Sequence, residues 1–272
     1  MRAMGNPEAF RNKKIIIYGT GYVAHMFHRV LRMHHLQNNI QCCVTTSNPE
    51  EKVFFEGIPV YGIHGVCMDE QTVVCLAVHE SVKDEIEHTV KKMTSQYVWV
   101  YPRLYEWMLG EPLHRNVEIS VGRLLEGYRK DLRLAVRLAA IEQHEGKNGY
   151  GFRYYINAQM LHCGIDTAGK RLEQFKGLLE DWKQFGYRRQ FPVTVNSSYE
   201  VIDGDHRMAV AAYLGQESIC CDIYPDRLTV QEIHENGAMM SGETLARYGF
   251  TKKDLDILEG IQRRYMDIYG TT

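Results

Sequence analysis

Five consecutive positions, Asp203-Gly204-Asp205-His206-Arg207, carry the densest set of reactive side chains in this sequence. They follow an apolar, strand-like lead-in and precede a run of small residues typical of a helix. A helix that begins there offers unpaired backbone N–H groups and the positive end of its dipole. His206 and Arg207 can donate to phosphate oxygens, and an aspartate can hold Mg²⁺ or accept a proton. The pattern predicts an anion site at a strand-to-helix turn, where Gly204 lets a ligand approach closely.

A plainer interpretation of the same residues stays open. In it, Asp205 caps the helix, Asp203 pairs with Arg207, and His206 lies at the surface. The direction of each side chain decides between the two interpretations.

A second motif that could bind a nucleotide follows the first predicted strand. Gly19, Thr20, Gly21 and Tyr22 open a helical pattern, and Ala24 completes a G-x-G-x-x-A spacing. The first glycine permits a tight turn, and the second lets a phosphate approach the backbone. The next strand runs into CVTTSN without the carboxylate that binds the ribose of NAD, so NAD is not expected. A glycine turn that merely closes a scaffold remains the alternative.

Strand-like apolar runs alternate with helical patterns over the first hundred residues, which predicts an α/β fold with a doubly wound parallel sheet. The candidate strands are 13–18, 40–46, 72–78 and 97–101, and a helix is expected at 81–93.

The second half of the chain has a different order of elements. A helix is expected at 122–145, followed by a glycine-rich break. Another is expected at 169–185, where Lys170 and Arg171 stand at the start and could complete a phosphate clamp. The remaining predicted elements are strands at 191–196 and 199–203, a helix at 205–214 and a strand at 218–224. We expect only helices and turns from 225 onward.

Two resemblances add to this outline. The segment 13–101, with its stretch FFEGIPVYGI, resembles the Rossmann-like N-terminal modules of bacterial sugar-modifying and polysaccharide-biosynthesis proteins. The segment FPVTVNSSYEVIDGDHRMAVAAYLG, with the helix KRLEQFKGLLEDWKQFGY before it, resembles the core of the ParB/sulfiredoxin-like superfamily. The resulting domain prediction is a Rossmann-like domain at 1–110, a helical connector at 111–149, and a ParB/sulfiredoxin-like α+β domain at 150–272.

The second resemblance implies chemistry that the residues at the turn can distinguish. Sulfiredoxins carry a nucleophilic cysteine at the position of Asp205, so a thiol mechanism is not expected. The closest match is the DGHHR motif of free-serine kinases of this fold. There the equivalent of Asp203 serves the acceptor hydroxyl, and those of His206 and Arg207 hold phosphates. The upstream stretch LHCGIDTAGKR contains only Asp166 where those kinases have a catalytic glutamate.

Composition narrows the classes of partner. The net charge is −2 and there is no lysine- and arginine-rich stripe, so nucleic-acid binding is not favoured. No window of 18 apolar residues indicates a membrane span. Seven cysteines without a C-x-x-C pair or a leader pattern suggest a reducing, cytoplasmic setting.

The sequence thus predicts a phosphotransferase that uses ATP or another nucleoside triphosphate with Mg²⁺ and acts on a small hydroxyl substrate. Cell-surface polysaccharide synthesis is the context that the resemblance implies. In this hypothesis Asp203 orients or deprotonates the hydroxyl, Asp205 binds Mg²⁺, and His206 with Arg207 clamps the phosphates. The alternatives are a regulatory module in which ATP or CTP switches a homo-oligomer without turnover, and a ParB-like DNA-binding or nuclease protein.

Overall fold

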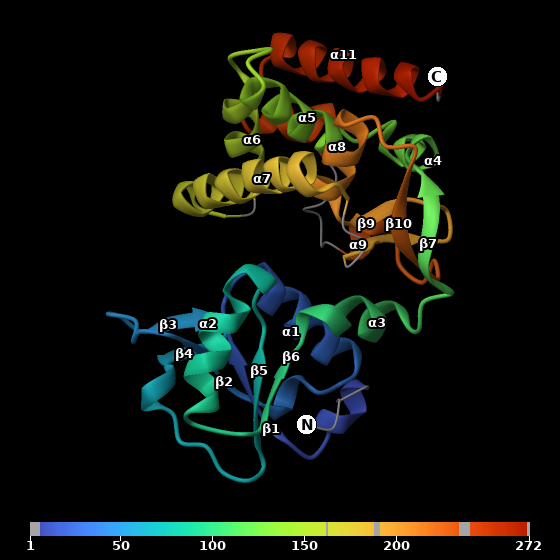
Figure 1. Ribbon diagram of the computed structural model, residues 1–272. Coiled ribbons are helices and arrows are strands. Elements are labelled where there is room, and N and C mark those ends of the chain that lie inside the picture. The colour runs from blue at the N-terminus through green and yellow to red at the C-terminus, as the bar shows by residue number, and fades with distance from the viewer. Residues whose placement is uncertain (1–5, 162, 188–190, 234–239, 271–272) are drawn as a thin grey trace. The chain divides into compact units, whose positions relative to one another are not determined.

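The computed structural model describes residues 6–161, 163–187, 191–233 and 240–270 (Figure 1). Contacts between residues divide the chain into two compact units, Met1–Gly110 and Glu111–Thr272. Each unit contains its own sheet and helices, and the predicted α/β fold class is confirmed. Residues 111–149, which the sequence suggested as a connector, belong to the second unit.

The first unit is built on a six-stranded sheet in the order β3-β4-β2-β1-β5-β6. All neighbouring strands pair in parallel except β3, which pairs antiparallel with β4. Strands β2, β3 and β4 lie on one side of β1, and β5 and β6 lie on the other, so the order of strands reverses between β1 and β5. The bounds are β1 Lys14–Tyr18, β2 Ile40–Thr45, β3 Val53–Phe55, β4 Ile58–Gly62, β5 Thr72–Leu76 and β6 Tyr97–Trp99.

Both faces of this sheet are buried, because apolar side chains of the central strands point alternately to each face. Ile16 and Tyr18 of β1 share a core cluster with Val74 and Leu76 of β5 and with Val90 of a helix. Because side chains alternate along a strand, Ile15 and Ile17 point to the opposite face, where they are also fully buried. The helices of the unit are α1 Tyr22–Met33, α2 Glu80–Lys91 and α3 Leu104–Leu109.

The second unit contains a four-stranded mixed sheet in the order β7-β10-β8-β9. Its strands are β7 His114–Ser120, β8 Val193–Asn196, β9 Val201–Asp203 and β10 Ser218–Tyr224. Only β10 and β8 pair in parallel. Strand β9 at the edge leads directly into the helix at Asp205.

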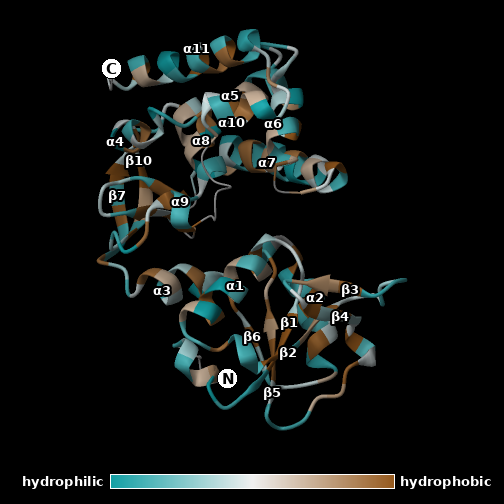
Figure 2. Ribbon diagram, turned by 180° about the vertical axis from the view of Figure 1, so that it is seen from behind, coloured by the Kyte–Doolittle hydropathy of each residue, from teal (hydrophilic) through white to brown (hydrophobic). Residues whose placement is uncertain are grey.

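Helix α5 lies at the centre of the helical layer of this unit, where it packs against α6, α8 and α11 (Figure 1). Ten of its twelve residues are buried. Figure 2 shows apolar residues along the helices of this layer, with hydrophilic positions between them. The helices are α4 Val121–Leu125, α5 Arg133–His144, α6 Gly151–Gln159, α7 Ile165–Phe185, α8 Asp205–Tyr213, α9 Val230–Ile233, α10 Gly242–Arg247 and α11 Lys252–Ile268.

The glycine-rich segment after α5 allows two helices to pack closely. It was expected to be a loop, but Gly151 is the first residue of α6. A Cβ at this position would lie 1.9 Å from the carbonyl oxygen of Ala139, so only glycine allows α6 to pack this closely on α5. The Asn148 side chain completes the junction by donating to Ala139 O and accepting from the N–H of Tyr150 and of Gly151.

The structure differs from the predicted elements at three other places. The helix expected at 122–145 is interrupted, because α4 ends at Leu125 and α5 begins only at Arg133. Strand β7 and the β3–β4 hairpin were not predicted. Helix α7 begins at Ile165 behind Gly164, earlier than 169, so Asp166 lies within its first turn. In the described part of the chain, no helix is both long enough and apolar enough to cross a bilayer.

Candidate functional site

The predicted strand-turn-helix at 203–207 is present in the second unit. Strand β9 ends at Asp203, Gly204 is the N-cap in the left-handed region with φ of 107°, and α8 begins at Asp205. A Cβ on Gly204 would lie 3.1 Å from Cγ2 of Val193, so both conformation and space require glycine. Glycine has no side chain with which to cap the helix. The first helical bond runs from Met208 N–H to Gly204 O, which leaves the earlier amides of α8 without an intrahelical acceptor.

Asp205 points into the unit, where cationic and hydroxyl groups surround its carboxylate. The Tyr128 hydroxyl donates to Oδ1 at 2.6 Å. Arg133 Nη1 and Arg137 Nη2 lie 3.5 and 3.4 Å from Oδ2. Burial tends to raise the pKa of Asp205, but the charges of Arg133 and Arg137 outweigh it and hold the pKa well below the usual range. Asp205 is therefore an ionised internal group.

Arg133 connects Asp205 to the rest of the unit. Its Nε donates to Oδ2 of Asp131 at 2.6 Å, and its Nη2 donates to the carbonyl oxygen of Val201 in β9 at 3.4 Å. Asp131 in turn accepts from the backbone N–H of Arg133 and of Met240. The network joins α5, β9 and the start of α8, and it fixes the turn from behind.

His206 packs against the aromatic rings of Tyr155 and Phe175 and is only partly exposed. Its Nε2 lies 2.8 Å from the Tyr155 hydroxyl, and its ring centroid lies 4.6 Å from that of Phe175. Burial lowers the pKa of His206 well below its ordinary value, the charge of Arg137 lowers it further, and Asp205 opposes them. Arg171 and Arg207 also lower this pKa. His206 is consequently neutral near pH 7.

Asp203 and Arg207 form the more accessible side of the turn. The side chain of Asp203 is 31% exposed and that of Arg207 is 21% exposed, and their closest O–N distance is 3.9 Å. Oδ1 of Asp203 accepts from the N–H of Gly204 at 2.9 Å. Nη1 of Arg207 donates to the carbonyl oxygens of Phe191 and Pro192. The plainer interpretation thus matches the structure at the Asp203–Arg207 pair. It is wrong at Asp205, which does not cap the helix because Gly204 is the N-cap, and at His206, which packs among aromatic rings.

The structure places Lys170 and Arg171 differently, although they are adjacent on α7. Arg171 is partly buried, its Nη1 donates to Oε1 of Gln159 at 2.9 Å, and its charge acts on His206. Lys170 is exposed, and no hydrogen bond or ion pair with another described residue joins it to the turn. Of the two, Arg171 is the cation that belongs to this site.

Magnesium fits only part of the predicted arrangement. Mg²⁺ prefers carboxylate and phosphate oxygens with room for water. Both oxygens of Asp205 already face donors or cations, so an ion there would have to displace Tyr128 and two arginines. The geometry disfavours Asp205 as a metal ligand, and Asp203 is the more exposed carboxylate of the turn.

Several residues of this site were missed by sequence reasoning. They are Tyr128, Asp131, Arg133, Arg137 and Tyr155. One signal was present, because arginines at i and i+4 stand inside an otherwise apolar helix, and long charged residues are seldom buried without partners. No local pattern indicates which carboxylate they pair with, since Asp205 lies about seventy positions away.

The glycine turn of the first unit follows the end of β1 as predicted. Gly19 has φ of 116°, and a Cβ there would lie 2.8 Å from the carbonyl oxygen of Ala77. Gly21 is the N-cap of α1 and has no atom within 4 Å of its Cβ position. Thr20 and Tyr22 are both exposed. These features leave the start of α1 open, at the point where the order of strands reverses.

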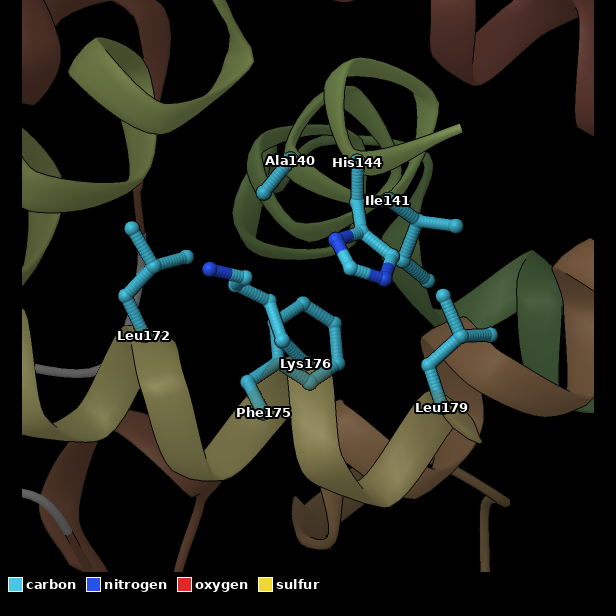
Figure 3. A pocket seen from close by; sticks show the side chains of 7 residues that line it. All are labelled: Ala140, Ile141, His144, Leu172, Phe175, Lys176 and Leu179. Carbon is cyan, nitrogen blue, oxygen red and sulfur yellow. The ribbon is translucent and has the colours of Figure 1, made fainter. Parts of the chain in front are cut away.

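A small apolar pocket lies between α5 and α7 (Figure 3). Ala140 and Ile141 of α5 face Leu172, Phe175 and Leu179 of α7 there. The other lining residues are His144 and Lys176, whose polar atoms pair with Glu180 and Glu173. The five apolar residues make this a gap typical of packed helices.

A cluster beside this pocket has the spacing of a metal site. One ligand atom each from His144, Glu145 and Glu180 lies within 4.8 Å of the others. The ammonium of Lys183 pairs with both glutamates and already supplies the positive charge. The cluster is therefore an ion-pair network that joins α5 to α7.

Comparison with known proteins identifies no relative. No protein-family model, no curated protein and no solved structure matches this chain. Function is therefore inferred from the geometry of the turn at 203–207 and its surroundings.

Proposed function

We propose that the β9–α8 turn binds the phosphates of a nucleoside triphosphate and that the second unit transfers a phosphoryl group to a small hydroxyl substrate. The observation that carries this proposal is the uncapped start of α8, which presents backbone amides beside Arg207 and behind a glycine whose φ of 107° strains any larger residue. Such a helix start binds phosphate without any further specialised group.

Phosphoryl transfer mainly requires positioning and charge neutralisation. The amides of α8 and the guanidinium of Arg207 supply the phosphate contacts. Asp203 stands at the exposed end of β9, where its carboxylate can orient the acceptor hydroxyl and accept its proton. The buried pair of Asp205 with Arg133 holds the turn in position from behind. In this proposal Mg²⁺ binds together with the nucleotide, and Asp205 is not one of its ligands.

A second candidate is a nucleotide-binding switch without turnover. The observation that favours it is the network behind the turn, which connects Asp205 to Asp131 and, through the N–H of Met240, to the segment before α10. Nucleotide binding at the turn could be transmitted along these contacts to the C-terminal helices. The context of polysaccharide synthesis and the Rossmann-like and ParB/sulfiredoxin-like resemblances remain proposals of the same kind.

A nucleotide screen followed by a transfer assay tests both candidates. Thermal shift with ATP, CTP, GTP and UTP in the presence of Mg²⁺ reports binding, because a ligand of the native state raises the melting temperature. Phosphorus NMR with small polyols and hydroxy amino acids as acceptors then reports a new phosphate ester. Arg207→Gln should reduce nucleotide binding. Arg247→Gln, which changes an exposed arginine of α10, is the matched control.

The outcomes separate the candidates. Binding with ester formation supports phosphotransfer, and binding without any release of phosphate supports the switch. If no nucleotide binds, or if Arg207→Gln binds as well as the wild type, the turn is not a nucleotide site.

A further inference from the structure

Of the guanidinium groups around His206, that of Arg171 has no carboxylate partner among the described residues. Arg171 donates to a neutral amide oxygen, that of Gln159. Arg137 lies 3.4 Å from Asp205, but Arg133 shares the same carboxylate oxygen. Asp131 is the closer partner of Arg133, so the carboxylates of Asp131 and Asp205 match these two arginines, and the charge of Arg171 is left unmatched.

Arg137 also has an unsatisfied donor. Its side chain is only 8% exposed, and its Nε has no hydrogen-bond acceptor among the described residues. The Nη1 donates to the carbonyl oxygen of Arg133 at 2.8 Å, so the guanidinium is held in place while the buried Nε lacks an acceptor. A buried donor without an acceptor is unfavourable, and a bound anion would satisfy it.

The charges of Arg137 and Arg171 act on one pair of side chains. Tyr155 and His206 contact each other at 2.8 Å, and both guanidinium charges act on each of them. Burial raises the pKa of Tyr155 to about 12, against the lowering effect of Arg137 and Arg171. The four residues come from α5, α6, α7 and α8, which lie side by side (Figure 1). Arg171 is only partly buried, so the group is reachable from solvent on its side.

We infer that Arg137 and Arg171 form an inner anion subsite beside His206, which binds one tetrahedral oxyanion, the terminal phosphate of the bound nucleotide. This inference rests on the proposed function, because it places the phosphate end of that ligand behind the turn. Charge-assisted hydrogen bonds from two arginines suit such a group, and the Nε of Arg137 gains its missing acceptor. Arg171 is then a binding residue and not a surface cation.

Calorimetric titration of the full chain with sulfate and with inorganic phosphate tests the subsite without any need for turnover. The wild type should bind both anions. Arg137→Lys keeps the charge beside Asp205 but removes the Nε donor, and Arg171→Gln removes the outer cation. Each should weaken sulfate binding at least about tenfold, since one hydrogen bond to a charged group is lost. Lys176→Gln, which removes a cation from the same helix, should leave the affinity within about twofold.

The same variants are then titrated with ATP and CTP, which distinguishes free from nucleotide-borne phosphate. If Arg137→Lys does not fold, Arg171→Gln decides. The inference is overturned if the wild type binds no anion, if Arg171→Gln binds sulfate normally, or if Lys176→Gln weakens binding equally. Sulfate binding that depends on Arg171, without nucleotide binding or transfer, upholds the subsite and overturns the proposed phosphotransfer.

Discussion

The Tyr128 hydroxyl donates a 2.6 Å hydrogen bond to the carboxylate of Asp205, although 77 positions separate the two residues in the chain. Tyr128 lies in the short turn between α4 and α5, and its side chain is 1% exposed. One buried hydroxyl thus fixes the first residue of the helix on which the candidate site depends.

Removal of this hydroxyl should destabilise the protein. Tyr128→Phe leaves one carboxylate oxygen of Asp205 without its donor, and a hydrogen bond to a charged group contributes about 1.5–3 kcal/mol. Urea unfolding followed by circular dichroism should show a loss of this size. Tyr248→Phe, at a residue 55% exposed, should change the free energy of unfolding by less than about 0.5 kcal/mol. Equal stability of the two variants would contradict the role given to Tyr128.

Of the two aspartates of the turn, Asp205 should matter mainly for stability and Asp203 mainly for ester formation. Asp205→Asn removes the charge that Arg133 and Arg137 face, and the loss of one partner of a buried ion pair costs about 3–5 kcal/mol. Asp203→Asn alters a partly exposed pair and should cost less than about 1 kcal/mol. In the transfer assay, however, Asp203→Asn should abolish ester formation. A stable, active Asp203→Asn variant would remove this residue from the proposed mechanism.

Acidification should weaken the fold through His206. Its pKa is far below the ordinary value in the folded protein, because it is buried and lies near Arg137, Arg171 and Arg207. The unfolded chain therefore binds the extra proton first, below a pH of about 6.5. Stability should fall as the pH decreases below that value, by up to about 1.4 kcal/mol per unit.

The contribution of His206 to this pH dependence is isolated by comparison with a variant that has no ionisable group at position 206. His206→Asn should reduce the slope of unfolding free energy against pH between 7 and 5. The exposed His114 provides the control, since His114→Asn should leave the slope unchanged. If wild type and His206→Asn have the same slope, folding does not lower the pKa of His206.

Glycine at 204 should be irreplaceable for the turn. Gly204→Ala places a Cβ 3.1 Å from Val193 at φ of 107°, and strain of this kind costs about 1–3 kcal/mol. Gly177→Ala, within α7 where nothing lies within 4 Å, should instead stabilise by about 0.5–1 kcal/mol. Melting temperatures that move in the same direction for both variants would argue against a strained turn.

The sequence predicted the elements whose signal is local. The strand that became β10 was placed at 218–224, its observed bounds, because a continuous apolar run is followed by a turn. The order of β9, Gly204 and α8 was recognisable for the same reason.

What could not be predicted depends on contacts between distant residues. Strand β7 is mostly polar and exposed, so it has no apolar pattern, and it exists because it pairs with β10. Gly151 indicated a loop because glycine disfavours helices, yet its lack of a side chain is what admits α6 against Ala139. Likewise, the charge of Asp205 was visible, but its partners Arg133 and Arg137 were not.

The shared carboxylate of Asp205 also constrains how this protein can diverge. A neutral residue at 205 would leave two arginines in the interior with one fewer anion, whereas a simultaneous loss of charge at 137 would restore the balance. Homologous chains should accordingly vary at positions 133, 137 and 205 together. A relative with a neutral residue at 205 and both arginines retained would be expected to fold only with an anion bound permanently in their place.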